Sequence, residues 1–282
     1  MQKNIFLENV KKKGFFVLKK YIKKKNIESL KKKILHSIND PKKILIAKNL
    51  KLAIKENPES IKFFQNKIKY NISDTQIKKG YKSYGKLTNK VLLRDPIQIC
   101  GNLFTELIKE KTIKLISSKI KNPKIGFIAL NCEFRNELPG NDANLIHTDD
   151  NSYKNNRDHL LKIAIPIHLK KNDNFEFRQI CIHKKKIKGL KQYMRNNEIP
   201  DNLKKKIVTP NVKSGDAVIF DPNNFYHFGE KTKYDVRIVL TLVIVDSKNY
   251  LKKKAKEIKI KNDIYKLLSN SQKKLCSMLT LC

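Results

Sequence analysis

Long apolar runs are missing from this sequence. The longest, residues 238–245, is interrupted by Thr241 and has the length of a strand, whereas a helix needs roughly 20 apolar residues to cross a bilayer. The first residues, 1–4, lead into mixed charge and not into the apolar segment of a secretory signal. We therefore expect a chain that neither spans a membrane nor is exported, and that works in the cytoplasm.

Cysteine is scarce and follows no pattern. The sequence has five cysteines, an odd number, and no two of them form a Cys-x-x-Cys pair. This spacing argues against a disulfide framework and against a zinc ribbon, and it is typical of reduced thiols in a cytosol. The five are Cys100, Cys132, Cys181, Cys276 and Cys282.

Acidic residues are few, since 26 Asp and Glu stand against 62 Lys and Arg and give a formal net charge of +36. Such an excess is typical of proteins that bind nucleic acid or another polyanion. The cations are mostly lysine, however, and they are spread along the whole chain, which has no tryptophan. A nucleic-acid platform gathers basic and aromatic residues in one patch, so we do not expect nucleic acid to be the main partner. The codon bias of an AT-rich genome explains the same composition, which leaves the lysine excess open between the two causes.

One stretch that could carry chemistry is His147-Thr148-Asp149-Asp150, which follows the apolar residues Leu145 and Ile146. In an extended strand alternate side chains share a face, so His147 and Asp149 point together while Asp150 points away. An imidazole and a carboxylate on one face are two potential metal ligands. The alternative is a polar strand end, with His147 in a local hydrogen bond and the aspartates solvated.

A third ligand candidate is His227, which follows the strand-like residues 216–220. Two histidines and one carboxylate are the ligand set of non-haem Fe(II) oxygenases, in which open coordination positions remain on the metal. The ordered combination of a His-x-Asp, a long gap and a later histidine favours the metal site over the polar strand end. We therefore predict His147, Asp149 and His227 as metal ligands and catalytic residues.

The tenth residue after His227 is Arg237, which opens the apolar residues 238–245. A guanidinium can bind a carboxylate through two parallel hydrogen bonds, and an unpaired charge in an apolar strand is costly to bury. We expect the strands of His227 and Arg237 to run antiparallel and side by side, with the guanidinium near the metal. The alternative is a surface arginine at the start of a strand.

These segments resemble the iron- and 2-oxoglutarate-dependent dioxygenases, and most of all the phytanoyl-CoA dioxygenase-like family. The likeness covers residues 145–150 and 214–245, together with a helix, a Gly-Phe strand and a second helix in residues 7–38. One element departs from the family pattern: residues 179–183 stand where the family often has a Pro-Gly-Ser-His stretch. Substrate-side geometry is therefore less closely matched than the metal site.

The resemblance implies Fe(II) as the metal, 2-oxoglutarate and O2 as co-substrates, and succinate and CO2 as products. It also implies that Arg237 binds the distal carboxylate of 2-oxoglutarate. The carboxylate of Asp149 favours hydroxylation, because related halogenases lack that ligand. We expect a small organic substrate; the alternatives are a basic jelly-roll binding protein and a hydroxylase acting on nucleic acid or protein.

The predicted fold is α+β with a mainly β core, a double-stranded β-helix (jelly roll, cupin-like) flanked by N- and C-terminal helices. We expect a single domain over residues 1–282, in which residues 1–122 are mostly helical, residues 123–246 form the jelly roll, and residues 247–282 form a helical extension. Strand signals with a period of two begin after Pro123. Besides the strand of His147, the expected strands are 126–134, 160–168, 175–182, 206–209, 217–220 and 236–245.

Helical spacing predicts four helices in the N-terminal part: 27–38 with Asn26 as cap, 43–55, 58–67, and 96–120 with Gly101 as a weak point. A basic insertion over residues 183–206 includes a helix-like segment, 190–195. It either gates the site or forms a solvated loop. We interpret His159, His168 and His183 as structural, because each lacks a correctly spaced carboxylate.

Overall fold

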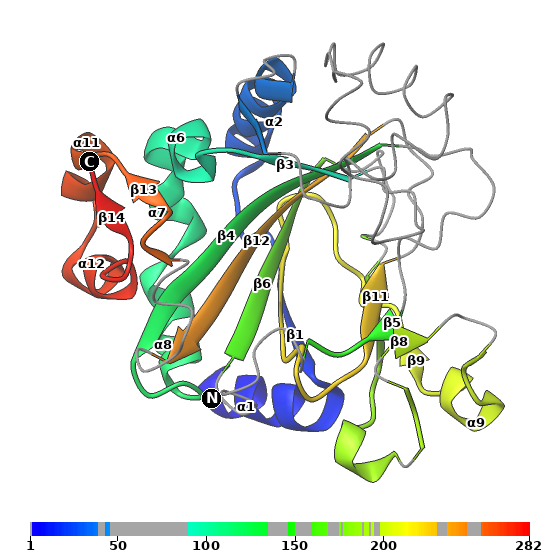
Figure 1. Ribbon diagram of the computed structural model, residues 1–282. Coiled ribbons are helices and arrows are strands. Elements are labelled where there is room, and N and C mark those ends of the chain that lie inside the picture. Colours follow the sequence, from blue (N-terminus) through cyan, green and yellow to red (C-terminus); the bar gives the residue numbers. More distant parts are fainter. Residues whose placement is uncertain are drawn as a thin grey trace.

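The computed structural model describes residues 2–38, 43–45, 90–134, 146–149, 160–168, 175, 177–187, 189–191, 193–194, 198–229, 236–246 and 255–282. Two antiparallel sheets face each other, and helices cover the outer side of the larger one (Figure 1). This arrangement is a jelly roll with flanking helices, so the predicted fold class is confirmed.

The larger sheet has seven strands in the order β1-β10-β6-β12-β4-β3-β2. Its centre is β12, which pairs along its length with β4 on one side and β6 on the other. The strands of this sheet are β1 (Phe15–Leu18), β2 (Ile44–Leu45), β3 (Lys90–Leu93), β4 (Pro123–Phe134), β6 (Leu160–His168), β10 (Ala217–Phe220) and β12 (Val236–Asp246). Long strands rich in isoleucine, valine and leucine form this centre, as the two-residue period predicted.

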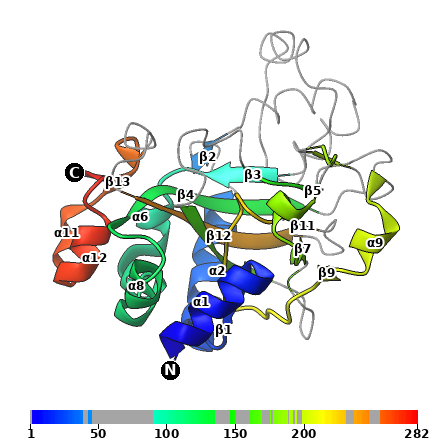
Figure 2. The ribbon, with the colours of Figure 1, turned by 90° about the horizontal axis from the view of Figure 1, so that it is seen from below.

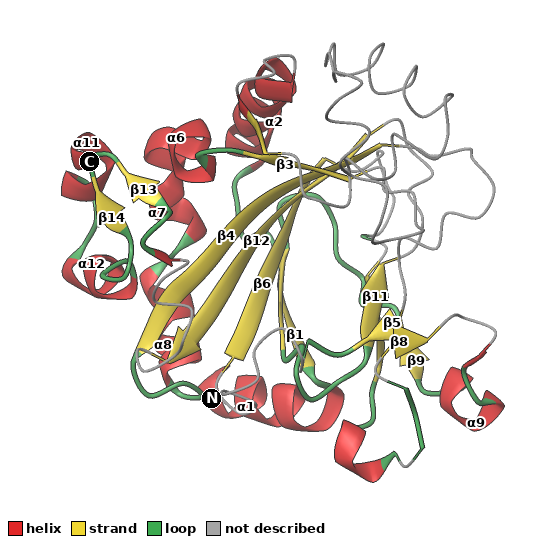
Figure 3. Ribbon diagram, viewed as in Figure 1, coloured by secondary structure: helices red, strands yellow, loops and turns green. Residues whose placement is uncertain are grey.

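The smaller sheet has five strands in the order β8-β5-β11-β7-β9, each of two to four residues. Its strands are β5 (Ile146–His147), β7 (Phe177–Ile180), β8 (Tyr193–Met194), β9 (Ile207–Val208) and β11 (His227–Gly229). Figure 3 shows these short strands opposite the long ones. The sheet that contains both predicted histidine ligands is therefore also the one with the least regular structure.

The helices lie mostly on the side of the larger sheet that faces away from the smaller one (Figure 2). They are α1 (Gln2–Lys13), α2 (Lys24–Ile38), α6 (Pro96–Cys100), the 3-10 helix η2 (Gly101–Leu103), α7 (Phe104–Leu107), α8 (Glu110–Ser117), η4 (Lys184–Lys186), α9 (Asp201–Lys204), α11 (Asn262–Lys266) and α12 (Asn270–Leu275). Two short parallel strands, β13 (Lys259–Ile260) and β14 (Thr280–Leu281), join the C-terminal helices. Within the described ranges, no helix combines the length and the apolar character needed to cross a bilayer.

The sequence predicts the stripe of α2 correctly, because Ile27, Leu30 and Ile34 are buried at helical spacing. The predicted cap is wrong, since α2 begins before Asn26, whose side-chain amide instead donates a hydrogen bond to Glu106 at 2.7 Å. The expected helix 96–120 is divided into short segments. Gly101 adopts a positive φ of 56° and closes α6, as its weak helix propensity predicted.

Three further expectations need correction or lie outside the described residues. Residues 44–45 form β2 and not the start of a helix, while residues 46–89 are outside the described ranges. In the insertion, Tyr193–Met194 is a strand, so the predicted helix 190–195 is wrong. The C-terminal extension contains α11 and α12, and it also contains the unexpected strands β13 and β14.

Two apolar clusters show how the layers pack. The larger cluster lies between the helices and the outer face of the larger sheet, and it includes Leu30 of α2, Ile163 of β6 and Leu240 of β12. A smaller cluster lies between the two sheets and includes Phe177 of β7 and Phe220 of β10. Most of the hydrophobic stabilisation therefore comes from the helix-covered face, which leaves the space between the sheets for polar groups.

Candidate metal centre

Three side chains meet between the sheets: His147, Asp149 and His227 (for the elements, see Figure 1). Each offers one ligand atom, and these atoms lie within 4.8 Å of one another. The Asp149 Oδ1 atom is 3.4 Å from His147 Nε2 and 3.9 Å from His227 Nε2. No other group of three such potential ligands occurs among the described residues. The structure therefore brings together all three predicted ligands, and their role as ligands stays a prediction.

Sheet register places the two histidines. His227 in β11 is directly opposite His147 in β5, and opposite residues of an antiparallel pair point to the same face. The ring centroids are 4.5 Å apart. Asp149 reaches the same point in a different way, because β5 ends at His147. Its backbone N–H donates to Pro222 O at 2.9 Å, so a bend held by this bond, and not strand alternation, orients the carboxylate.

The carboxylate of Asp149 is buried, with 5% of the residue exposed, yet it is held in its charged form. Burial raises the pKa of this group, but the positive charge of Lys162 and a hydrogen bond from His147 lower it, and the net pKa lies well below its ordinary value. Lys162 of β6 forms an ion pair with Oδ2, whereas the distances to the two histidines are those of Oδ1. A deprotonated oxygen is thus available to a metal.

His227 is held in the neutral form that a metal requires. Burial and the neighbouring His147 lower the pKa of His227 to about 3. Its Nδ1 atom lies 3.3 Å from Phe225 O, so a proton on Nδ1 can be donated to this carbonyl. This tautomer leaves the Nε2 lone pair free for the centre of the triad.

Aromatic rings close one side of the triad. The rings of Phe177 and Phe220 lie 4.8 Å apart, and their centroids are 6.4 Å and 5.1 Å from that of His227. His227 is buried accordingly, whereas 29% of the His147 side chain is exposed. The accessible side of the centre is therefore the side of His147.

Arg237 lies in β12 and is 5% exposed, which excludes the alternative of a surface arginine. Strand alternation places it on the same face as Val239, a member of the cluster between the sheets. The predicted side-by-side pairing is wrong, because β11 belongs to the smaller sheet and β12 to the larger. In the register of β12 with β4, the residue opposite Arg237 is Glu133.

Two residues beside the triad, Lys162 and Gln179, were not predicted from the sequence. Lys162 interrupts an apolar strand, a signal that is hard to notice in a chain with so many lysines. Gln179 of β7 is fully buried and directly opposite His227, and its amide donates to Lys13 O at 2.6 Å. Gln179 thereby links the smaller sheet to the end of α1.

The basic insertion takes part in the ligand sheet. Met194 pairs with Ile146, and Tyr193 pairs with His147, so β8 is hydrogen-bonded directly to the ligand strand. The insertion is therefore part of the smaller sheet at these two residues. The exposed lysines of η4 lie apart from the pairing.

The spare histidines behave as structural residues where they are described. His183 accepts a hydrogen bond from the Lys185 backbone N–H at 3.2 Å, and its ring packs edge-on against Phe225. His168 ends β6, where burial lowers its pKa. His159 and Asp150 lie outside the described residues.

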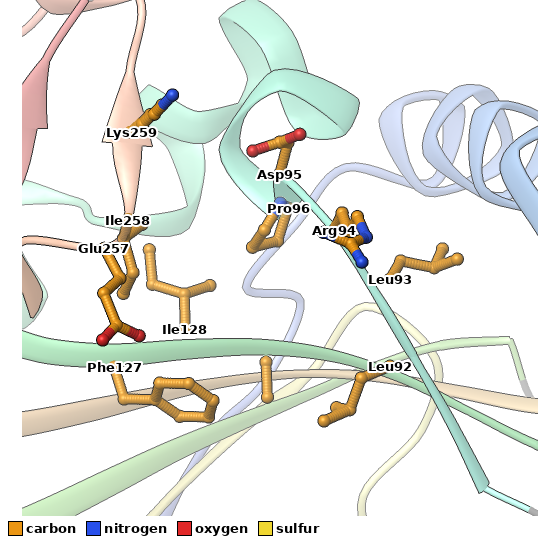
Figure 4. A pocket seen from close by; sticks show the side chains of 11 residues that line it. Leu92, Leu93, Arg94, Asp95, Pro96, Phe127, Ile128, Glu257, Ile258 and Lys259 are labelled. Carbon is orange, nitrogen blue, oxygen red and sulfur yellow. The ribbon is translucent and has the colours of Figure 1, made fainter. Parts of the chain in front are cut away.

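A pocket of about 470 Å³ lies beside β3, β4 and β13, away from the triad. Figure 4 shows the charged groups of Arg94, Asp95, Glu257 and Lys259 around apolar side chains such as Phe127. None of the predicted ligands lines this pocket. The hollow is therefore a feature separate from the candidate metal centre.

Comparison with known proteins finds likeness in structure alone. No family model matches the chain, and no curated protein sequence does. One similar solved structure is HygX from Streptomyces hygroscopicus with nickel, 2-oxoglutarate and hygromycin B bound. It has a TM-score of 0.53 at 8% identity, over 86% of this chain and 87% of that one.

Two other solved structures give the same result. EctD from S. alaskensis with 2-oxoglutarate and 5-hydroxyectoine has a TM-score of 0.51 at 13% identity, over 86% of this chain and 75% of that one. The non-heme alpha ketoglutarate dependent carbocyclase SnoK from nogalamycin biosynthesis has a TM-score of 0.54 at 11% identity, over 86% and 83%. At these identities the likeness shows a shared fold, and it does not confirm the phytanoyl-CoA dioxygenase-like branch.

Proposed function

We propose that the protein is an Fe(II)- and 2-oxoglutarate-dependent oxygenase that hydroxylates a small organic substrate. The observation that carries this proposal is that His147, Asp149 and His227 bring one ligand atom each within 4.8 Å of one another inside a jelly roll. The fold supports it, because the similar proteins HygX and EctD were crystallised with 2-oxoglutarate.

The donor set fits ferrous iron. Two imidazole nitrogens and one carboxylate oxygen leave open positions on the metal, which a chelating co-substrate and O2 can take. Both His227 and Asp149 have the deprotonated form that ligation needs. When bound, the iron would supply O2 activation coupled to the decarboxylation of 2-oxoglutarate to succinate.

The remaining residues have distinct tasks in this proposal. Arg237, on the inner face of β12, would bind the distal carboxylate of 2-oxoglutarate by a bidentate pair. Phe177 and Phe220 would exclude water behind His227, because their rings surround its buried side. The exposed side of His147 would admit the substrate.

A small substrate is the better match to a site enclosed by two sheets. HygX was crystallised with hygromycin B and EctD with 5-hydroxyectoine, both small molecules. Hydroxylation is proposed because three protein ligands include the carboxylate of Asp149; the carbocyclase SnoK shows that the fold also serves another reaction.

The net charge of +36 favours a second candidate, a hydroxylase that acts on a nucleic acid or protein polyanion. Ionic strength separates the two candidates. Turnover that depends on polyanion docking should weaken steeply between low and physiological salt, whereas small-molecule turnover should change little.

The direct test loads the purified protein anaerobically with Fe(II) and 2-oxoglutarate, admits O2, and measures succinate. We expect succinate to form even without a substrate, at a rate that Asp149→Ala removes. His168→Ala is a matched control, because it removes a histidine that is half-buried at the end of β6 and lies outside the triad. Absence of both 2-oxoglutarate binding and succinate from the iron-loaded wild type would overturn the proposal.

A further inference from the structure

We propose that Lys162 is the counter-ion of Asp149 and makes metal binding depend on a dianionic co-substrate. The inference rests on the proposed function and concerns the same centre. It assigns a positioning role to a residue that does not itself offer a ligand atom to the metal.

The position of Lys162 follows from the register of β6. It is opposite Phe220 of β10, whose ring contacts His227, so both side chains lie on the inner face of the larger sheet. The Lys162 side chain is 18% exposed and forms an ion pair with Oδ2 of Asp149. A lysine from the larger sheet thus reaches the carboxylate that belongs to the ligand set.

The two oxygens of Asp149 have separate partners. Oδ1 faces His147 Nε2 at 3.4 Å and His227 Nε2 at 3.9 Å, while Oδ2 faces the ammonium. With Oδ2 engaged, Asp149 offers one oxygen to a metal and not two. The carboxylate is also fixed in orientation before any metal binds, as metal ligands generally are by their outer partners.

The positive charge of Lys162 should affect how strongly the centre binds a metal. A metal-bound imidazole is neutral, so two imidazoles and one carboxylate would together carry one negative charge, which the ammonium of Lys162 cancels. A divalent metal then joins four side chains (His147, Asp149, His227 and Lys162) whose charges cancel, and it adds two positive charges to them. In a buried site this excess is unfavourable until an anion arrives, and a dianion such as 2-oxoglutarate neutralises it.

Metal and 2-oxoglutarate should therefore strengthen each other's binding, and Lys162 should set much of that coupling. Coupling between two ligands is reciprocal and is typically about 5- to 150-fold. If Lys162 only stabilised the fold, its removal would weaken metal binding by the same factor with and without 2-oxoglutarate.

In the test, Ni(II) is titrated into the protein with and without saturating 2-oxoglutarate. Ni(II) is used because it does not support turnover with O2, which would disturb the measurement. The variants are Lys162→Met and Lys162→Gln; the glutamine keeps a hydrogen-bond donor for Oδ2 but removes the charge. Isothermal calorimetry gives the two dissociation constants for each, and circular dichroism reports the fold. Lys162→Arg should behave like the wild type, because it keeps the charge.

We expect both neutral variants to bind Ni(II) alone at least about three-fold more tightly than the wild type, and the enhancement by 2-oxoglutarate to fall about ten-fold. Lys19→Met is the matched control, because Lys19 pairs with buried Asp216 at 3.0 Å and does not contact the triad. It should leave both constants unchanged.

Two outcomes overturn the inference while the proposed function stands. One is an unchanged enhancement in a folded Lys162→Gln or Lys162→Met. The other is weaker Ni(II) binding in both variants, alone and with 2-oxoglutarate, by the same factor. A wild type that binds neither Ni(II) nor 2-oxoglutarate would instead overturn the proposed function itself.

Discussion

The two faces of the larger sheet carry different kinds of side chain. On the outer face of β12, Ile238, Leu240 and Leu242 are at most 1% exposed and pack against the helices. On the inner face, Arg237 lies in the same strand, and Lys162 comes from the neighbouring β6. One strand thus contributes apolar packing through one face and charge to the candidate site through the other.

The difference has a physical meaning. Burial of an isoleucine or leucine stabilises the fold by about 1.5–3 kcal/mol, whereas burial of a charge is unfavourable unless it is paired. Charged residues are therefore retained on the inner face at some expense of stability. Substitutions on the outer face should therefore change mainly the free energy of unfolding, and substitutions on the inner face should change mainly ligand affinity.

The largest effect is expected at the triad, which the inner face of the larger sheet contacts through Lys162. His147→Ala, Asp149→Ala and His227→Ala should each weaken Fe(II) binding more than about 100-fold, because each removes a proposed ligand; loss of an outer partner typically costs 10- to 100-fold. Anaerobic calorimetry measures the loss, and circular dichroism checks the fold.

Asp150→Ala is the matched control for the triad. It removes the adjacent carboxylate, which is outside the triad, and it should keep iron. If Asp150→Ala lost iron and Asp149→Ala retained it, the ligand assignment would be wrong by one residue.

On the outer face, Leu240→Ala should lower the free energy of unfolding by about 2–5 kcal/mol, because it leaves a cavity in the larger apolar cluster. The measurement is urea denaturation followed by circular dichroism. Iron affinity, measured where the variant is still folded, should stay within about two-fold of the wild type. A large loss of iron affinity in the folded variant would show that the two faces are not independent.

On the inner face, Arg237→Ala should weaken 2-oxoglutarate about 30-fold or more and leave iron binding intact. Removal of one member of a buried charge pair costs about 2–5 kcal/mol, and about 2 kcal/mol corresponds to this factor. Arg237→Lys should recover only part, because an ammonium cannot form the bidentate pair. The absorbance of the iron–2-oxoglutarate complex follows the titration.

Arg237 also has a possible structural role, because it is opposite Glu133 in the register of β12 and β4. If Arg237→Ala lowered stability and left 2-oxoglutarate affinity unchanged, the arginine would be a structural residue of the sheet and would be removed from the site. The free energy of unfolding and the 2-oxoglutarate affinity of Arg237→Ala together therefore decide whether Arg237 stabilises the sheet or binds the co-substrate.

The sequence predicted the long strands well, because apolar alternation and burial agree there. The expected strands 160–168 and 217–220 match β6 and β10 residue for residue. The convergence of His147 and His227 also followed, since a jelly roll pairs the strands that contain them. In each case the local pattern and the tertiary pairing point to the same structure.

What the sequence could not predict depends on tertiary pairing alone. β5 and β8 have two residues each, too few for any period; β5 pairs with β8 on one side and with β11 on the other, and β8 pairs with β5. The sheet change between His227 and Arg237 has no local signal. Lys162 was missed for another reason: one more lysine is inconspicuous among 62 basic residues.

The smallest effect is expected in the insertion, which contains both a buried apolar residue and exposed charged residues. Met194 is buried in the smaller sheet and pairs with the ligand strand, whereas Lys185 and Lys186 of η4 are exposed. Exposed charges contribute about 0–1 kcal/mol, so Lys185→Ser with Lys186→Ser should change uncoupled succinate formation by no more than about two-fold. Iron affinity should not change, because neither lysine belongs to the strands of His147 and His227.

If the lysines dock a polyanionic substrate, the same double variant would lose turnover of that substrate. The loss would be steep at low salt and smaller at physiological salt, where screening already weakens the contact. Collapse of uncoupled succinate formation in the folded double variant would contradict this account and would place η4 within the catalytic centre.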